Sequence, residues 1–165
     1  MIKINIVLLE PEIPFNTGNI GRTCAATDAA LHLIRPLGFS TDDKYLRRSG
    51  MDYWKSLDVR YYDSFDDFLT QNGHPRPYMA TTKARHSYAD AAYQDGCFIM
   101  FGKESQGIPE EILLSYPDTA IRIPMRPNTR SLNLSNAVAV VLYEALRQQD
   151  FAGLESQGQL HRHHW

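Results

Sequence analysis

Hydrophobic and polar positions follow one another along the chain in short blocks that predict alternating strands and helices. Residues 2–9 are rich in Ile, Val and Leu with little alternation, which is typical of a strand buried on both faces of a parallel sheet. Similar short apolar runs predict further strands at residues 31–35, 59–62, 78–82, 97–101 and 120–125.

The segments between these runs carry helix-start signals. They predict helices that begin near Asn16 or Thr17, near Thr41 or Asp42, after Ser64, at Pro109 and at Asn136. This alternation favours an α/β fold, with a mostly parallel sheet covered by helices on both faces. Such sheets bind ligands at the carboxyl ends of their strands, so we expect the site in the loops after residues 9, 82, 101 and 125.

Composition sets the size of the protein and narrows its partners. The chain has 165 residues, of which 43% are hydrophobic, enough for one domain with a sizeable core. We expect that domain over residues 1–150, followed by a polar, flexible tail over 151–165. The formal charge of −2 argues against nonspecific coating of nucleic acid, although local basic patches remain compatible with it.

Metal, disulfide and membrane signals are weak. Cys24 and Cys97 both lie in apolar contexts and lack the spacing of a disulfide framework or a zinc site. His161, His163 and His164 lie in the polar tail, and we assign them no metal. No apolar run approaches the ~20 residues of a membrane span. We therefore expect a soluble, cytoplasmic protein with no metal and no membrane partner.

The first motif, NTGNIGR, opens the first predicted helix. Capping by Asn16 explains one residue but not Gly18 and Gly21, because glycine inside a helix costs up to ~1 kcal/mol relative to alanine. The glycines indicate close approach of another backbone or a ligand. A helix N-terminus with Arg22 nearby also suits a phosphate group.

The second motif, FGKESQGIP, follows the most apolar predicted strand. Its glycine spacing matches neither a phosphate-binding P-loop nor the dinucleotide-binding fingerprint. An ordinary strand-to-helix turn would need one glycine, whereas Gly102 and Gly107 bracket Glu104. This pattern indicates a backbone wrapped around a ligand.

The third motif, IPMRPNTRSLNLSNAV, precedes the last helix. A helix cap at Ser135 or Asn136 explains one polar residue, but Ser131 and Asn133 also alternate with leucines. Polar groups near a core need partners, so the run serves the loop, a ligand, or both.

Two further patterns concern partners. The last helix is apolar without a break over residues 137–142, which favours burial against a second subunit. Basic residues gather in three places near the predicted ligand-side loops and favour a polyanion: Lys44, Arg47 and Arg48; Lys83, Arg85 and His86; Arg126 and Arg130.

Taken in this order, the three motifs resemble those of the SPOUT class of methyltransferases, the α/β-knot RNA methylases. The stretches NIVLLEPEIPFNTGNIGRTCAA, DDKYLRRSGMDY and TTKA are similar to one subgroup, the 2′-O-ribose methylases of the tRNA wobble nucleotide. The resemblance covers residues 4 to about 148. It implies a C-terminal deep trefoil knot, in which the chain after Met125 passes through an earlier loop. The residue pattern alone predicts an ordinary doubly wound sheet.

The resemblance also implies a cofactor and its pocket. S-adenosylmethionine would be the methyl donor, held by Ala80, Thr81, Gly102, Glu104, Gly107, Ile123, Met125, Ser131 and Leu132. Arg22 would act at the ribose 2′-hydroxyl; since a guanidinium stays protonated, we expect it to orient a phosphate and stabilise the developing alkoxide. Glu104, Ser135 and Asn136 would complete the catalytic set by fixing the loop and the ribose.

The implied substrate is tRNA methylated at nucleotide 34, cytidine or uridine, in leucine tRNAs. The RNA would be bound by Asn16, Asn19, Lys44, Arg47, Arg48, Arg126 and Arg130. A homodimer would bring Arg22 of one chain to the pocket of the other. Two alternatives remain open: methylation of another tRNA or rRNA nucleotide, and a noncatalytic RNA-binding α/β module that would not bind S-adenosylmethionine tightly.

Overall fold

A computed structural model describes residues 2–41, 44 and 53–165. The short basic helix predicted from residue 41 or 42 therefore lies largely outside the described residues. So do Arg47 and Arg48.

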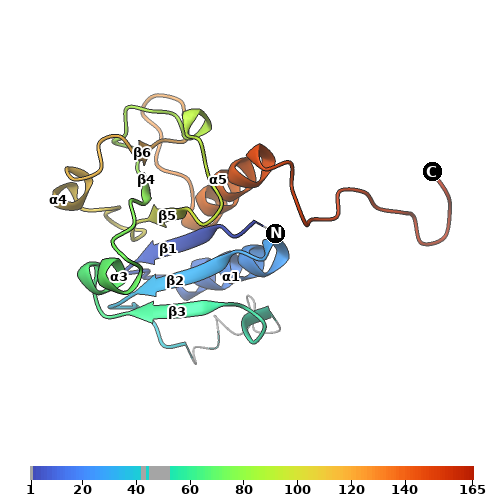
Figure 1. Ribbon diagram of the computed structural model, residues 1–165, viewed down its shortest axis with the longest axis horizontal. Helices are drawn as coiled ribbons and strands as arrows, with labels where there is room; N and C mark the ends of the chain where they lie inside the picture. The colour runs from blue at the N-terminus through green and yellow to red at the C-terminus, as the bar shows by residue number, and fades with distance from the viewer. Residues whose placement is uncertain (1, 42–43, 45–52) are drawn as a thin grey trace.

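The core of the protein is a sheet of six strands, all parallel, as expected (Figure 1). In chain order the strands are β1 (Asn5–Leu9), β2 (Ala30–Ile34), β3 (Val59–Tyr62), β4 (Tyr78–Ala80), β5 (Phe98–Phe101) and β6 (Ala120–Ile121). Their order across the sheet is β3-β2-β1-β5-β4-β6. The carboxyl ends of β4, β5 and β6 thus meet at one edge, where the second and third motifs begin.

Helices cover both faces, which confirms the predicted layers. Over the residues that the structure describes, the helices with defined bounds are α1 (Pro14–Thr27), α3 (Phe65–Gln71), α4 (Glu110–Leu113) and α5 (Leu134–Gln148), with a 3-10 turn, η1, at Tyr88–Asp90. Strand β1 shows how the faces divide, because successive side chains point to opposite sides. Ile6 and Leu8 join the core beneath α1 and α5, whereas Val7 and Leu9 join the core beneath α3 and α4.

Several element boundaries differ from the sequence-based expectation. Helix α1 begins at Pro14, not at Asn16 or Thr17, because proline is preorganised for the first helical turn. Helix α5 begins at Leu134 and is capped by Asn133, not by Ser135 or Asn136. The cap at Ser64 is confirmed, since its side chain accepts a hydrogen bond from the Asp67 N–H.

The strand predicted at residues 120–125 ends at Ile121, because the chain changes partners there. Thr81 N–H donates to the Ile121 carbonyl (2.9 Å) on the β4 side. Tyr88 N–H donates to the Arg122 carbonyl (2.8 Å), and Arg122 N–H donates to the His86 carbonyl (2.9 Å). The chain at 121–122 therefore lies between β4 and the loop that follows β4. Such enclosure is what the implied trefoil knot requires; the knot itself stays a prediction.

Beyond α5, the chain leaves the body of the protein. Residues 155–165 have no regular secondary structure, and Figure 1 shows this tail extending away from the sheet and helices. Among the helices that the structure describes, none is long and apolar enough to cross a membrane.

Candidate active site

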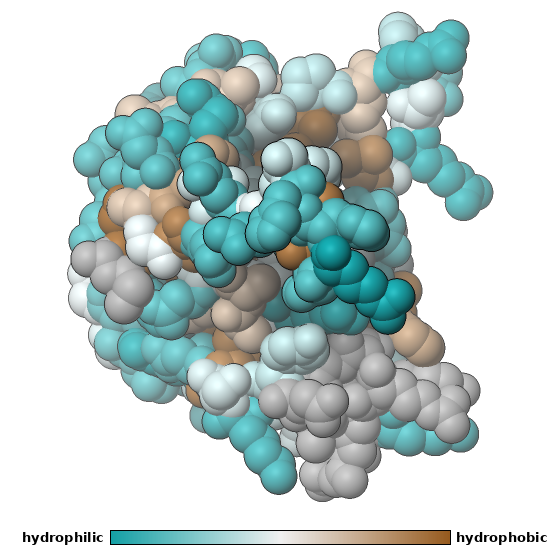
Figure 2. All heavy atoms as spheres, turned by 90° about the vertical axis from the view of Figure 1, so that its right-hand side faces the viewer, coloured by the Kyte–Doolittle hydropathy of each residue, from teal (hydrophilic) through white to brown (hydrophobic). Residues whose placement is uncertain are grey.

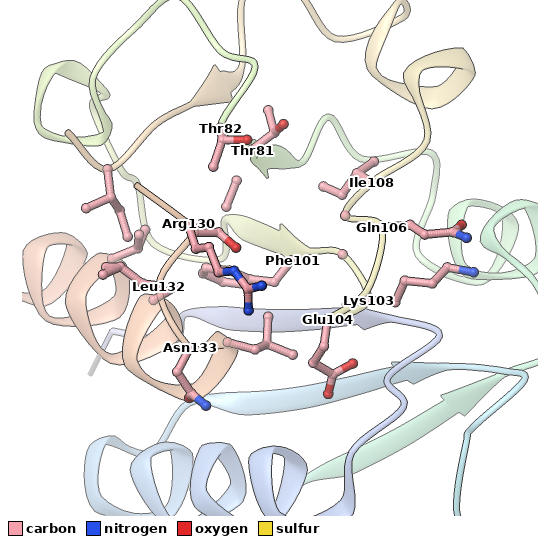
Figure 3. A pocket seen from close by; sticks show the side chains of 18 of the residues that line it. Thr81, Thr82, Phe101, Lys103, Glu104, Gln106, Ile108, Arg130, Leu132 and Asn133 are labelled. Atoms are coloured by element: carbon pink, nitrogen blue, oxygen red, sulfur yellow. The ribbon is translucent and has the colours of Figure 1, made fainter. Parts of the chain in front are cut away.

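A cavity of about 540 Å³ lies where β4, β5 and β6 end and α5 begins (Figure 3). The structure brings together in its lining all the residues predicted to hold the cofactor: Ala80, Thr81, Gly102, Glu104, Gly107, Ile123, Met125, Ser131 and Leu132. They come from four separate segments of the chain. The second and third motifs thus form one site, as expected from parallel strands that end at the same edge.

The two glycines of the second motif shape this cavity in different ways. A Cβ on Gly102 would lie against the backbone of Gly107 and Ile108, closer than atoms can approach. Gly102 is therefore required by the loop's own backbone, not by the path of a ligand. Gly107 has a φ of +70°, which favours glycine, and open space lies where its side chain would be.

Glu104 joins this loop to the start of α1. Its carboxylate accepts hydrogen bonds from the backbone N–H groups of Glu12 (2.9 Å) and Ile13 (3.1 Å). The Asn16 amide also donates to it (3.4 Å). Two of these donors are backbone groups at the N-terminus of α1, where a negative charge is favourable. In this chain, Glu104 therefore positions the first motif against the second.

Asn133 completes the connection; the sequence placed it in a polar run that serves the loop or a ligand, but did not predict that it caps the last helix. Its side-chain oxygen accepts from Ser135 N–H (2.9 Å) and Ser135 Oγ (2.6 Å), while its amide donates to Asn16 Oδ1 (3.1 Å). An Asn directly before an apolar helix is a strong N-cap signal, which could have identified it. All three motifs are thereby linked through Glu104, Asn16 and Asn133.

Ser135 and Asn136, predicted as catalytic, lie in the first turn of α5. Neither belongs to the residues that line the cavity. Their backbone N–H groups both donate to the Asn133 cap. Their contact with the ribose stays a prediction.

Arg22 does not line the cavity of its own chain. It is exposed on α1, and its guanidinium sits 5.4 Å from the centre of the Tyr53 ring. The neighbouring Gly21 was expected to meet a backbone or a ligand. Instead, the Trp54 ring packs against it, 3.0 Å from where a Cβ would be.

The predicted RNA-binding residues fall in different places. Asn16 is buried and serves the Glu104 connection, whereas Asn19, Lys44 and Arg126 are exposed. Arg130 lines the cavity, and Figure 3 shows its side chain reaching across the cavity. In the described part of the chain, no group of three or more His, Cys, Asp or Glu side chains is arranged to hold a metal ion.

Fold and cavity together define an α/β protein with its candidate site at the carboxyl ends of parallel strands. The chain belongs to the SpoU rRNA Methylase family, whose model matches residues 3–143. This membership confirms the resemblance to RNA methylases.

Individual relatives are similar over nearly their whole length. A protein of Escherichia coli (strain K12) named tRNA (cytidine(34)-2'-O)-methyltransferase is 50% identical over 151 residues, which cover 91% of this chain and 96% of that protein. A protein of the same name from Methylovorus glucosotrophus is 47% identical over 150 residues, covering 90% and 97%. A solved structure described as "Structural insights into the 2-OH methylation of C/U34 on tRNA" superposes with a TM-score of 0.86 at 43% identity, covering 91% and 98%.

Proposed function

We propose that this protein transfers a methyl group from S-adenosylmethionine to the ribose 2′-hydroxyl of nucleotide 34 of tRNA. The observation that carries the proposal is the cavity in which the second and third motifs meet. The names of the relatives support the choice of nucleotide, cytidine or uridine 34. Which tRNAs are used is a narrower proposal, and we keep the leucine tRNAs implied by the resemblance.

The cavity residues fit S-adenosylmethionine chemically. Ile123, Met125 and Leu132 offer an aliphatic wall for adenine, and the glycine-containing loop 102–107 exposes backbone groups that can hydrogen-bond polar atoms. When bound, this cofactor supplies a methyl group already activated by the sulfonium charge. The remaining task of the protein is to align the 2′-hydroxyl and to stabilise the charge that develops on it.

Arg22 is suited to that second task, and we infer that it performs it for another chain. It does not line the cavity of its own chain, and a protonated guanidinium can bind a phosphate and stabilise an alkoxide. We therefore propose a two-fold homodimer in which Arg22 reaches the partner's cavity.

Helix α5 supports the dimer. One of its faces is buried against the sheet, but Val140 and Tyr143 on the opposite face remain 38% and 44% exposed. On the side where α5 ends, Figure 2 shows hydrophobic residues at the surface among hydrophilic ones. A second copy of the chain would remove the α5 residues from water. The proposed tRNA substrate is cytoplasmic, and Cys24 and Cys97 are free thiols, so we place the protein in the cytoplasm.

The test is methylation of a tRNA transcript with S-adenosylmethionine carrying a deuterated methyl group. Nuclease digestion and mass spectrometry then locate the label. We expect it on the ribose of nucleotide 34, and we expect no transfer to a transcript with a single 2′-deoxy substitution there. Label at a different nucleotide would favour another RNA site, and RNA binding without transfer would favour a noncatalytic module.

A further inference from the structure

A second, smaller cavity of about 240 Å³ lies beside the first and has no role in the function described so far. It is formed where β1, β2 and β5 end. Its lining consists of Glu10 and Glu12 after β1, Pro36, Leu37 and Gly38 after β2, and Lys103, Ser105 and Gln106 after β5.

The two cavities share a wall. Lys103, Ser105 and Gln106 line both of them. Figure 3 shows the side chains of Lys103 and Gln106 pointing away from Leu132 and Asn133, toward the side where β1 ends. The second cavity therefore lies directly beyond the 103–106 segment, on the other side of it from the first cavity.

The second cavity is held in shape by its loops. Glu12 accepts hydrogen bonds from Ser105 N–H (3.1 Å) and Ser105 Oγ (2.7 Å), and these bonds lower the pKa of the Glu12 carboxyl. Gly38 N–H donates to the Pro11 carbonyl (2.9 Å), and a Cβ on Gly38 would come within 2.7 Å of the Glu12 carbonyl oxygen. The loops after β1, β2 and β5 thus touch one another, so the cavity is preformed.

Glu10 and Lys103 supply a matched acceptor and donor. Lys103 Nζ lies 3.6 Å from Glu10 Oε1, and the two side chains are only 22% and 30% exposed. The Glu12 carboxylate is already engaged by Ser105, whereas Glu10 makes one ion pair within the part of the chain that the structure describes. A carboxylate beside an ammonium group complements a flat ring that presents a donor beside an acceptor.

The chemistry of a ribonucleotide indicates what such a ring would be. In a ribonucleotide, the carbon that carries the 2′-oxygen is bonded directly to the carbon that carries the base. When the 2′-hydroxyl is presented to the first cavity, the base must therefore lie immediately beside that cavity. A cavity of about 240 Å³ is smaller than usual pockets for drug-sized ligands and suits a single ring. Cytosine offers its N4 amine beside the N3 acceptor, and carboxylates accept from that amine.

We propose that this second cavity binds the pyrimidine base of the methylated nucleotide, with Glu10 accepting from the cytosine amine and Lys103 donating to N3 or O2. The proposal rests on the proposed function and deepens it. It predicts that cytidine is preferred to uridine, because the O4 of uracil would face the Glu10 carboxylate. A glutamine at position 10 could donate to that O4.

The test compares three tRNA transcripts that differ only at nucleotide 34, which is cytidine, uridine or the cytidine analogue 2-pyrimidinone riboside, which lacks the amine. For the natural chain, kcat/KM should be highest with cytidine. Glu10→Gln should lower the cytidine-to-uridine ratio of kcat/KM at least about tenfold. Glu111→Gln, an exposed glutamate on α4, should leave the ratio unchanged.

The effects on kcat/KM of removing the cytosine amine and of removing the Glu10 carboxylate should not be additive. If the two groups touch, loss of the amine lowers kcat/KM in the natural chain but has little further effect in Glu10→Gln. Calorimetric binding of S-adenosylhomocysteine establishes that the variant is folded; if it is not, the three transcripts with the natural chain decide alone.

Equal losses for cytidine and uridine, or full activity of the natural chain on the amine-free analogue, would overturn the base site while leaving the methylase function intact. No methyl transfer to nucleotide 34 of any transcript would instead refute the function on which the base site rests.

Discussion

His32 is a buried titratable residue on strand β2 of the sheet. The Asn5 amide donates to the carbonyls of Gly96 and Cys97, so its Oδ1 faces His32 Nε2 at 3.0 Å and requires a proton on that nitrogen. Nδ1 then accepts from the Tyr62 hydroxyl at 2.7 Å. Both ring nitrogens are thereby satisfied in the neutral form. Burial lowers the pKa of His32 from 6.5 to about 4.

The neutral, buried state of His32 predicts that the protein becomes less stable as the pH falls. Between pH 6.5 and about 4, the unfolded chain binds a proton at His32 that the folded chain does not, so the free energy of unfolding falls as the pH drops. The loss should reach at most about 3 kcal/mol and should not grow further below about pH 4. Urea unfolding from pH 7.5 to 4 measures it.

His32→Gln is the matched control for this prediction. Its amide can replace both hydrogen bonds but does not titrate, so its free energy of unfolding should fall less than that of the natural chain between pH 6.5 and 4.5. Equal pH dependence in the two proteins would show that His32 is not responsible. The half-buried residues Glu12 and Asp67, whose carboxyl pKa values are lowered by hydrogen bonds, lose their charge at lower pH.

The start of α5 combines a structural and a functional contact in one side chain. As the N-cap, Asn133 satisfies the Ser135 and Asn136 N–H groups, and through its amide it binds Asn16 of α1. The two contacts use opposite ends of the amide. Substitutions can therefore separate them.

Asn133→Ala should lower the free energy of unfolding by about 1–2 kcal/mol, because the cap is lost. Asn133→Asp should retain most of that stability, since Asp caps as well as Asn, but it cannot donate to Asn16. We expect both variants to reduce kcat for methyl transfer, because both release α1 from the third motif. Urea unfolding and tRNA methylation on the same samples measure the two effects. An Asn133→Asp protein with full activity would show that the contact with Asn16 is dispensable.

Much of the molecule follows from short-range patterns. Short, mostly apolar runs predict the six parallel strands, because strands covered by helices on both faces have no polar side. Since parallel strands end at one edge, the same reasoning predicts that the glycine-containing loop 102–107 and the third motif meet. The residues of the cofactor pocket were assigned by resemblance, and their convergence on one cavity agrees with that reasoning.

The features that were missed depend on contacts between distant segments. Asn133 links two motifs because it donates a hydrogen bond to Asn16, 117 residues away. Gly21 is required because the Trp54 ring packs against it. Strand β6 ends early because Arg122 pairs with residues 86–88. The second cavity arises where three loops meet, and no single loop carries a signal for it. Periodicity reports on the faces of one element, so it cannot reveal such partners.

At the scale of the whole molecule, the position of Arg22 makes methyl transfer depend on the proposed homodimer. Arg22 does not line the methyl-donor cavity of its own chain, and we propose that its guanidinium reaches a cavity across the two-fold axis. One variant can disable each half: Arg22→Ala removes the guanidinium, and Leu132→Asp places a charge in the exposed aliphatic wall of the cavity. Each variant alone should be inactive.

Denaturing the two variants together and refolding them is the decisive measurement. If Arg22 acts on the partner's cavity, each mixed dimer contains one intact site, and methylation of tRNA should recover to about a quarter of the natural activity under random pairing. If Arg22 acts within its own chain, every site carries one defect. Mixed dimers confirmed by native mass spectrometry but without recovered activity would contradict the shared site.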